Sequence, residues 1–375
     1  MSALALISSL SLAIWIGLLL AYDGFWRARE TDEVPARDPA AWPSVVAVVP
    51  ARDEADVVGR AIASLAAQDY PGSFAIVLVD DGSTDGTGDV ARGAGGDRLE
   101  VIVGSAPPAG WTGKLWAMRN GVAHATASTP RYVWFTYADI EHAPDTLRSL
   151  VARSEAESLA MSSLMAELRC DSLAERALIP AFVFFFQMLY PFARVNRPTA
   201  TMAAAAGGCM LVRREALEAA GGVAAIIDDL ALGTSLKRQG PIRLSLTRRS
   251  VSIRPYGGWR DIGAMVARSA YAQLRYSPWL LLGTLFGMAL VYLDPPLFAL
   301  AGHGVARLTG ALAWLLMAVA FQPMLRFYRR SPLWGIALPA IGLFYAGATF
   351  MSAWRHWQGR GGMWKGRAQA DLGAK

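Results

Sequence analysis

The chain has 375 residues, of which 54% are hydrophobic, and its formal net charge is +6. This length accommodates one large domain together with membrane segments, and the apolar share is too high for an ordinary soluble enzyme. The positive charge does not indicate a nucleic-acid partner, because many basic residues flank apolar segments, where anionic lipid headgroups bind them. We therefore expect the lipid bilayer, and no nucleic acid, as a partner.

Apolar stretches near both ends of the chain approach the roughly 20 residues that cross a bilayer. They cover residues 1–22, 276–306 with Asp294 as the one charged residue, 308–325 and 331–353. The sequence predicts a transmembrane anchor at 1–22, a domain at 43–275, a C-terminal transmembrane region at 276–354 and a basic tail at 355–375. Two alternatives stay open: Asp294 and the prolines after it divide one stretch in two, or one stretch is re-entrant or interfacial.

The first apolar stretch is expected to be an uncleaved anchor rather than a signal peptide. No Lys or Arg precedes it, and no clear A-x-A cleavage site follows. Arg27 and Arg29 come just after it, and basic residues near a span tend to stay in the cytosol. The domain is therefore predicted on the cytosolic side of a multi-pass protein. Cys170 and Cys209 fit this placement, since their spacing suggests neither a disulfide framework nor a zinc site.

The domain begins with alternating strand and helix patterns. Strands are predicted at 45–49, 74–79, 99–103 and 132–137, and helices at 57–65 and 114–125. This order makes βαβ units, whose right-handed crossovers give a parallel sheet and an α/β fold. Asp80, Asp81, Asp139 and Glu141 fall at strand ends, where such sheets bind ligands. Because these carboxylates would repel one another, they predict a site for a metal and a diphosphate.

Other nucleotide-binding folds lack their signatures here. Neither G-x-G-x-x-G nor G-x-x-x-x-G-K-[ST] follows the first strand. The sequence therefore does not favour a dinucleotide-dependent dehydrogenase or a P-loop NTPase. A nucleotidyltransferase would need a Gly-rich basic loop where Arg52, Asp53 and Glu54 stand. A non-catalytic membrane scaffold would be favoured if the acidic residues were replaced, and most of them are present.

Several short motifs occur in a characteristic order. They are P-A-R-D-E at 50–54, V-D-D-G-S at 79–83, G-K at 113–114 followed by Asn120, D-I-E at 139–141 and D-D at 228–229. The combination resembles the family 2 glycosyltransferases from about 45 to 276. The resemblance implies the GT-A fold, a Rossmann-like and mostly parallel α/β domain, here with transmembrane helices at both ends. It also implies an inverting transfer from a nucleotide-sugar, most simply a UDP-sugar.

The resemblance assigns roles to individual residues. Asp81 would bind the base, with Asp80 near the ribose and Lys114 near the diphosphate. The remaining donor-binding candidates are Pro50, Arg52, Glu54, Asp139 and Arg275. Asp139 and Glu141 would hold Mg²⁺ or Mn²⁺, as hard carboxylates do, although Glu141 replaces the usual Asp.

The same resemblance makes Asp229 the general base, beside Asp228 in place of the usual Glu. For each assignment a structural alternative stays open. Asp80 and Asp81 could shape a turn, Lys114 could be a solvated helix-start lysine, Arg275 could flank a span, and the pair at 228–229 could cap a helix. His142 could be a ligand or a polar surface residue.

The segment 177–192 carries six aromatic residues between Arg176 and Arg194. It predicts an interfacial segment under the active site, with a buried core helix as the alternative. The overall motif set resembles the hopanoid-biosynthesis-associated glycosyltransferases, relatives of ceramide glucosyltransferase. That resemblance implies a bacterial inner-membrane enzyme with a hopanoid or similar lipid as acceptor. Ceramide, diacylglycerol, carotenoid and polyprenyl phosphate are alternative acceptors, and the oligomeric state is not predicted.

Overall fold

The computed structural model describes residues 2–108, 111–225, 229–359, 363–364 and 367–368. Contacts divide the chain into two compact units. We call residues 30–169, 192–254 and 364–375 the sheet unit, and residues 1–29, 170–191 and 255–363 the helical unit. The helical unit takes in 170–191 and 255–275, two segments that the sequence had placed within the domain at 43–275.

The sheet unit is built on an eight-stranded mixed sheet in the order β3-β2-β1-β4-β7-β6-β8-β5. Its strands are β1 (Val45–Ala51), β2 (Phe74–Asp80), β3 (Leu99–Val103), β4 (Tyr132–Thr136), β5 (Ile140–His142), β6 (Met161–Glu167), β7 (Cys209–Arg213) and β8 (Ile242–Ser252). The first four are parallel to one another, as predicted, because helices connect them. β7 then runs antiparallel to β4 and β6, and β5 runs antiparallel to β8.

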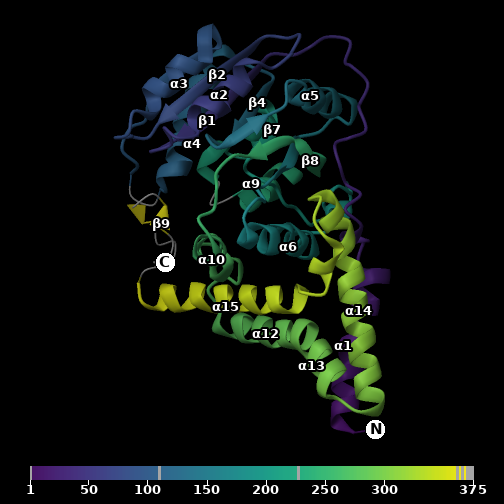
Figure 1. The fold of residues 1–375 in the computed structure, drawn as a ribbon. Coiled ribbons are helices and arrows are strands. Elements are labelled where there is room, and N and C mark those ends of the chain that lie inside the picture. Colours follow the sequence, from purple (N-terminus) through teal and green to yellow (C-terminus); the bar gives the residue numbers. More distant parts are fainter. Residues whose placement is uncertain (1, 109–110, 226–228, 360–362, 365–366, 369–375) are drawn as a thin grey trace. The chain divides into compact units, whose positions relative to one another are not determined.

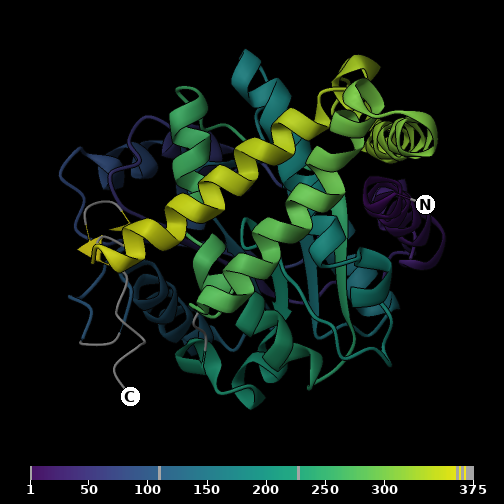
Figure 2. The same cartoon turned by 90° about the horizontal axis from the view of Figure 1, so that it is seen from below.

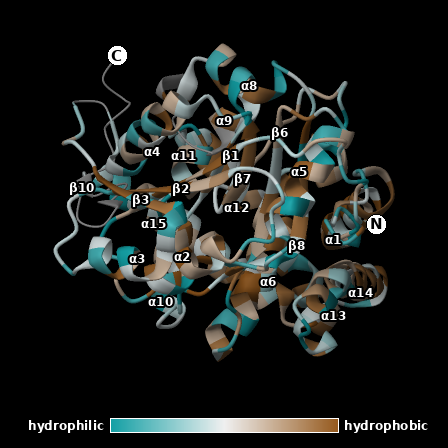
Figure 3. Ribbon diagram, turned by 90° about the horizontal axis from the view of Figure 1, so that it is seen from above, coloured by the Kyte–Doolittle hydropathy of each residue, from teal (hydrophilic) through white to brown (hydrophobic). Residues whose placement is uncertain are grey.

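Both faces of β1 are covered, so this strand is buried and apolar along its whole length (Figure 3). The helices of the sheet unit are α2 (Val58–Ala66), α3 (Thr87–Gly95), α4 (Gly113–Ala125), α5 (Thr146–Ala156), α7 (Phe192–Val195), α8 (Arg214–Ala219) and α9 (Asp229–Lys237). Val45, Ala47 and Val49 of β1 share one buried cluster with Ile62 of α2 and Ala91 of α3. Since side chains alternate along a strand, the residues between them face α4 on the other side.

The contact between α4 and the sheet depends on Gly121. A Cβ atom added there would lie 2.4 Å from Val48 and 2.9 Å from Val79, both stiff side chains. Gly121→Ala is therefore expected to destabilise the protein by about 1–3 kcal/mol through overpacking. Gly93 of α3 is the matched control, because its added Cβ meets nothing within 4 Å. There Ala should stabilise the helix by about 0.5–1 kcal/mol, and equal melting temperatures for the two variants would contradict the packing argument.

The helical unit combines long apolar helices with shorter ones. It contains α1 (Ala3–Ala21), α6 (Leu173–Leu189), α10 (Trp259–Ala267), α11 (Ala270–Gln273), α12 (Pro278–Met288), a π-helical turn (Ala289–Leu293), α13 (Asp294–Ala301), α14 (Gly304–Phe327) and α15 (Leu338–Trp357). A separate two-stranded sheet pairs β9 (Met363–Trp364) with β10 (Arg367–Ala368). α1 and α14 lie side by side (Figure 1), and the Ser8 hydroxyl donates to the Ala306 carbonyl at 2.9 Å.

Three stretches of the described chain are long and apolar enough to cross a membrane: Ala3–Ala21, Pro278–Ala301 and Gly304–Phe327. The second is not one straight helix, because the π-helical turn separates α12 from α13 just before Asp294. The span predicted at 331–353 is not among them, since α15 mixes Gly, Thr, Ser and Tyr with its apolar residues. Within the helical unit, α12 and α15 run across α1 and α14, which Figure 2 views nearly end-on.

The aromatic segment at 177–192 is largely the helix α6, and its central side chains are buried inside the helical unit. Phe184 is fully buried and contacts Phe25 and Phe321, with ring centroids 5.5 and 5.2 Å away. The Tyr345 hydroxyl of α15 donates to the Leu178 carbonyl at 2.9 Å. The buried-helix alternative therefore fits Phe184, but Phe182, Phe185, Phe186 and Tyr190 are only partly buried, so the interfacial segment stays a prediction.

Candidate active site

Two loops meet at the carboxyl ends of β1 and β2 and are joined by hydrogen bonds. The backbone N–H of Asp53 donates to Ser83 Oγ at 3.0 Å, and that of Glu54 donates to Thr87 Oγ1 at 2.8 Å. In return, Asp53 Oδ1 accepts from the Thr84 backbone at 2.9 Å. Asp53 has a positive φ of 49°, which few residues other than glycine adopt. The loops that carry the predicted donor-binding residues therefore hold each other in place.

The two aspartates after β2 have different surroundings. Asp80 accepts a hydrogen bond from the Ser83 backbone N–H at 2.8 Å. It therefore shapes the turn, which was the alternative to a ligand-binding role. Asp81 is only 3% exposed, and its carboxylate lies 3.7 Å from Arg52 Nη1. Arg52 also donates to the Asp81 carbonyl, and Pro50 lies in β1 just before it. A buried carboxylate held by one arginine is a suitable acceptor for a ligand's N–H groups, which is the role predicted for Asp81.

Lys114 lies at the start of α4, where the Thr112 side chain caps the helix. Its ammonium group is 3.7 Å from the centre of the Tyr137 ring, in a cation–π contact. Tyr137 follows β4 and precedes Asp139 by two residues. The structure thus places Lys114 close to the end of β4, beside the segment that carries the predicted metal ligands.

Arg254 joins two of the predicted site carboxylates. Its Nε donates to Asp139 Oδ2 at 2.9 Å, and its Nη2 donates to Glu54 Oε2. Burial by itself lowers the pKa of the Arg254 guanidinium, but the hydrogen bonds and charges of Asp139 and Glu54 outweigh it, so this pKa lies above its ordinary value. The arginine therefore stays charged and links the loop after β1 to the loop after β4.

The sequence did not point to Arg254. It lies two residues after β8, in S-I-R-P-Y, and none of the motifs found in the sequence includes it. Its position depends on β8 pairing with β5, and the Ile253 N–H donates to the Asp139 carbonyl at 2.9 Å. Only a prediction of that long-range pairing would have brought Arg254 to the site.

Glu141 has a different partner from Asp139. Its Oε2 lies 2.5 Å from Arg60 Nη2 of α2, and both side chains are well exposed. Among the residues that the structure describes, no group of three or more His, Cys, Asp or Glu side chains is placed to hold a metal. Mg²⁺ and Mn²⁺ in phosphate-handling sites are commonly bound by one or two carboxylates together with substrate phosphates. Asp139, with Glu141 close by in sequence, fits that kind of site.

His142 is neither a metal ligand of such a group nor a surface residue, so both interpretations drawn from the sequence were wrong. It is 3% exposed, and its ring nitrogens lie 2.8 Å from Thr136 Oγ1 and 2.9 Å from Ser250 Oγ. The Trp134 ring packs on it with centroids 4.7 Å apart. Burial lowers the pKa of His142 from 6.5 to about 3. The pairing of β5 with β8 buries this residue.

The buried His142 predicts a pH dependence of stability. Between pH 6.5 and about 3, the unfolded chain binds a proton at this residue and the folded protein does not. The free energy of unfolding should therefore fall as the pH is lowered through this window. In His142→Gln, the melting temperature should fall less between pH 7 and pH 4 than in the wild type. A variant with the same slope as the wild type would show that other groups cause the acid destabilisation.

The remaining predicted residues lie in other parts of the chain. Asp228 lies outside the described residues, and Asp229 is the first residue of α9. Arg275 belongs to the helical unit, two residues after α11, and has a positive φ of 52°. The roles assigned to these three residues stay predictions.

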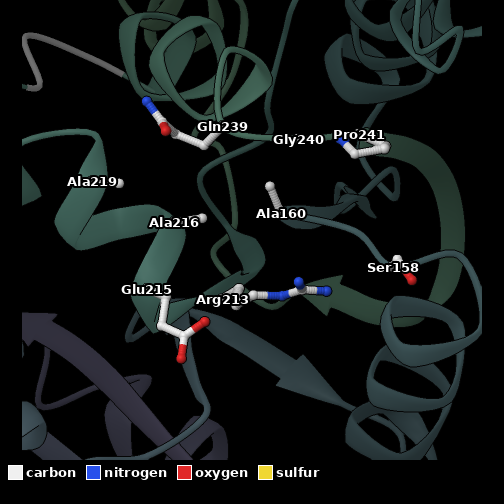
Figure 4. Close-up of a pocket in the computed structure, with 9 residues that line it drawn as sticks. All are labelled: Ser158, Ala160, Arg213, Glu215, Ala216, Ala219, Gln239, Gly240 and Pro241. Atoms are coloured by element: carbon white, nitrogen blue, oxygen red, sulfur yellow. The ribbon is translucent and has the colours of Figure 1, made fainter.

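A cavity of about 260 Å³ opens elsewhere in the sheet unit (Figure 4). It is lined by Ser158, Ala160, Arg213, Glu215, Ala216, Ala219, Gln239, Gly240 and Pro241. Arg213 pairs with Tyr132, the first residue of β4, whereas Asp139 follows the other end of that strand. The cavity therefore lies at the opposite edge of the sheet from the acidic loops, and no predicted site residue lines it.

Comparison with known proteins shows what part of the chain is similar to. Residues 46–221 match the model of glycosyl transferase family 2. The chain is 32% identical over 90 residues to 4,4'-diaponeurosporenoate glycosyltransferase of Staphylococcus aureus (strain bovine RF122 / ET3-1). That match covers 24% of this chain and 23% of the relative, so it spans less than a quarter of the relative's length.

A solved structure resembles most of the chain. It is the mannosyltransferase PcManGT from Pyrobaculum calidifontis in complex with GDP-Man and Mn²⁺, with 20% identity and a TM-score of 0.55. The match covers 94% of this chain and 99% of that one. At this identity the likeness shows the fold, and the α/β GT-A fold predicted from the sequence is confirmed. Residues 46–221 thus match glycosyl transferase family 2, in agreement with the resemblance seen in the motifs.

Proposed function

We propose that this protein is an inverting glycosyltransferase that moves a sugar from a nucleotide-sugar to a membrane lipid. The observation that carries the proposal is the set of acidic residues and Lys114 at the carboxyl ends of β1, β2 and β4, within a family 2 domain. In parallel sheets this edge is where ligands bind. The candidate membrane spans in the same chain support an acceptor that resides in the bilayer.

Each residue has a role in this proposal. The Asp81 carboxylate accepts hydrogen bonds from the base, and Asp80 fixes the turn beside the ribose. Lys114, with Arg52 and Arg275, offsets the negative charge of the diphosphate. Asp139 and Glu141 would hold Mg²⁺ or Mn²⁺, which supplies further charge to stabilise the leaving diphosphate. Asp229 takes the proton from the acceptor hydroxyl, and Asp228 precedes it in the sequence as a second carboxylate.

A UDP-sugar is the first candidate donor, because the resemblance to family 2 favours uracil opposite Asp81. GDP-mannose is the second, since the structurally similar mannosyltransferase was solved with it and with Mn²⁺. Both donors present a diphosphate to the same acidic and basic groups. The two donors therefore differ at this site in their nucleobase, uracil or guanine.

The acceptor is proposed to be a hopanoid or a similar polycyclic lipid in a bacterial inner membrane, with the catalytic domain on the cytosolic side. A carotenoid acid is the second candidate, because the Staphylococcus aureus relative is a diaponeurosporenoate glycosyltransferase. Both are rigid, largely apolar molecules with one polar end. Either would present its polar end at the bilayer surface.

A donor and acceptor screen tests the proposal. The full chain, purified in detergent, is incubated with Mn²⁺, extracted bacterial lipids and either UDP-glucose, UDP-N-acetylglucosamine or GDP-mannose. We expect release of one nucleoside diphosphate and a lipid that gains the mass of one sugar. Release with free sugar and no glycosylated lipid would mean that water had taken the sugar and would contradict a lipid acceptor, and binding of none of the donors would refute the proposed activity.

A further inference from the structure

We propose that Arg254 and a divalent cation compete for the carboxylate of Asp139, and that Glu54 retains Arg254 when the cation binds. The inference rests on the proposed function, because it concerns the metal that would accompany the donor. It adds a residue that no family motif marks. It also predicts that metal and donor bind together more strongly than either alone.

The geometry shows that Arg254 and the cation would bind the same group, the carboxylate of Asp139. Arg254 Nε donates directly to Asp139 Oδ2 at 2.9 Å, so a cation coordinated by that oxygen would lie against the guanidinium. The three side chains are largely sheltered, with exposed fractions of 18% for Asp139, 32% for Arg254 and 9% for Glu54. Water screens two adjacent positive charges poorly in such surroundings. The arginine must therefore leave Asp139, at least in part, for the cation to bind there.

Glu54 gives the displaced arginine a second partner. A different nitrogen of the guanidinium, Nη2, already donates to Glu54 Oε2. The Glu54 backbone is itself fixed, since its N–H donates to Thr87 Oγ1 at 2.8 Å. Arg254 can rotate away from Asp139 without losing its whole electrostatic stabilisation. A fixed tether of this kind keeps the positive charge next to the site.

The charges explain why the donor should favour the exchange. Asp139, Glu54 and Arg254 together carry one negative charge, and a divalent cation changes the sum to one positive charge. The diphosphate of a nucleotide-sugar brings about two negative charges near neutral pH. The displaced guanidinium can then donate to phosphate oxygens, for which its planar fork is well suited. Metal alone should thus bind weakly, and metal with nucleotide should bind well.

The test measures Mn²⁺ binding to the full chain in detergent, by calorimetry and without nucleotide. Arg254→Gln should bind Mn²⁺ about tenfold more tightly than the wild type, since a hydrogen bond to a charged group no longer has to be broken. Glu54→Gln should change the affinity in the opposite direction, because Arg254 then has only Asp139 as its carboxylate partner. Arg254→Lys keeps the charge and should stay close to the wild type, which separates competition from misfolding.

Arg148→Gln is the matched control. It removes the same charge from an arginine–carboxylate pair, but from the surface pair with Asp38, which has no part in the proposed site. Its Mn²⁺ affinity should not change. Equal tightening in Arg148→Gln and Arg254→Gln would attribute the effect to net charge, and weaker or unchanged binding in Arg254→Gln would overturn the proposal. UDP and GDP binding to the wild type in EDTA reports separately on the proposed function, because it requires neither Mn²⁺ nor the exchange at Asp139.

Discussion

Asp229→Asn is expected to slow sugar transfer by roughly 10²- to 10⁴-fold, which is the usual contribution of a general base. Asparagine keeps the size of the side chain but cannot accept the proton of the acceptor hydroxyl. The affinity for the donor should stay nearly unchanged, because Asp229 is proposed to contact the acceptor. Single-turnover transfer to lipid, measured beside nucleotide binding by calorimetry, separates the two effects.

The neighbouring residue supplies the control for this result. Asp228→Asn removes a carboxylate next to Asp229 and should reduce the rate less, since it acts only through the charge of the pair. If Asp229→Asn kept the wild-type turnover while Asp228→Asn lost it, the base would be Asp228. A loss of donor binding in Asp229→Asn would instead place that residue in the nucleotide site.

The second large effect is expected at Asp81, where Asp81→Asn should weaken nucleotide binding by about 10- to 100-fold. The estimate follows from the loss of a charge-assisted hydrogen bond, which contributes about 1.5–3 kcal/mol. The carboxylate is 3% exposed and lies 3.7 Å from Arg52, so the substitution also leaves that arginine with less counter-charge. Calorimetric titration with UDP and Mn²⁺ gives the affinity, and thermal melting shows whether the variant remains folded.

Asp89→Asn is the control for Asp81→Asn. Asp89 is an exposed aspartate of α3 that pairs with Arg92 at 2.7 Å. The substitution removes the same charge a few residues further along the chain and should leave UDP binding unchanged. Equal weakening in both variants would attribute the loss to overall charge. An unchanged affinity in Asp81→Asn would show that the base contacts a different residue.

The sequence predicted the parallel part of the sheet well, because its signals are local. The run at 99–103 is β3, and the runs at 45–49 and 74–79 extend by only one or two residues in the structure. The apolar stretches were harder to interpret. Composition cannot distinguish a helix buried among its neighbours from one facing lipid, so it did not show that Phe184 of α6 packs on Phe25 and Phe321.

The candidate site was predicted where residues follow strand ends, and missed where distant segments meet. Asp80, Asp81 and Asp139 were named from strand order alone. The partners Arg254 and Arg60 come from the segment after β8 and from α2, which contact this region only after the sheet has formed. His142 was misread for the same reason, since its burial results from the pairing of β5 with β8.

The hydrogen bonds between the loops after β1 and β2 also bear on the rate at which a nucleotide binds. Ser83, Thr84 and Thr87 fasten these loops to each other within the protein itself. An arriving nucleotide therefore does not have to order them, and less of its binding energy is lost to loop entropy. At this part of the site the association rate should rise in proportion to nucleotide concentration, without the plateau that a slow loop closure would impose.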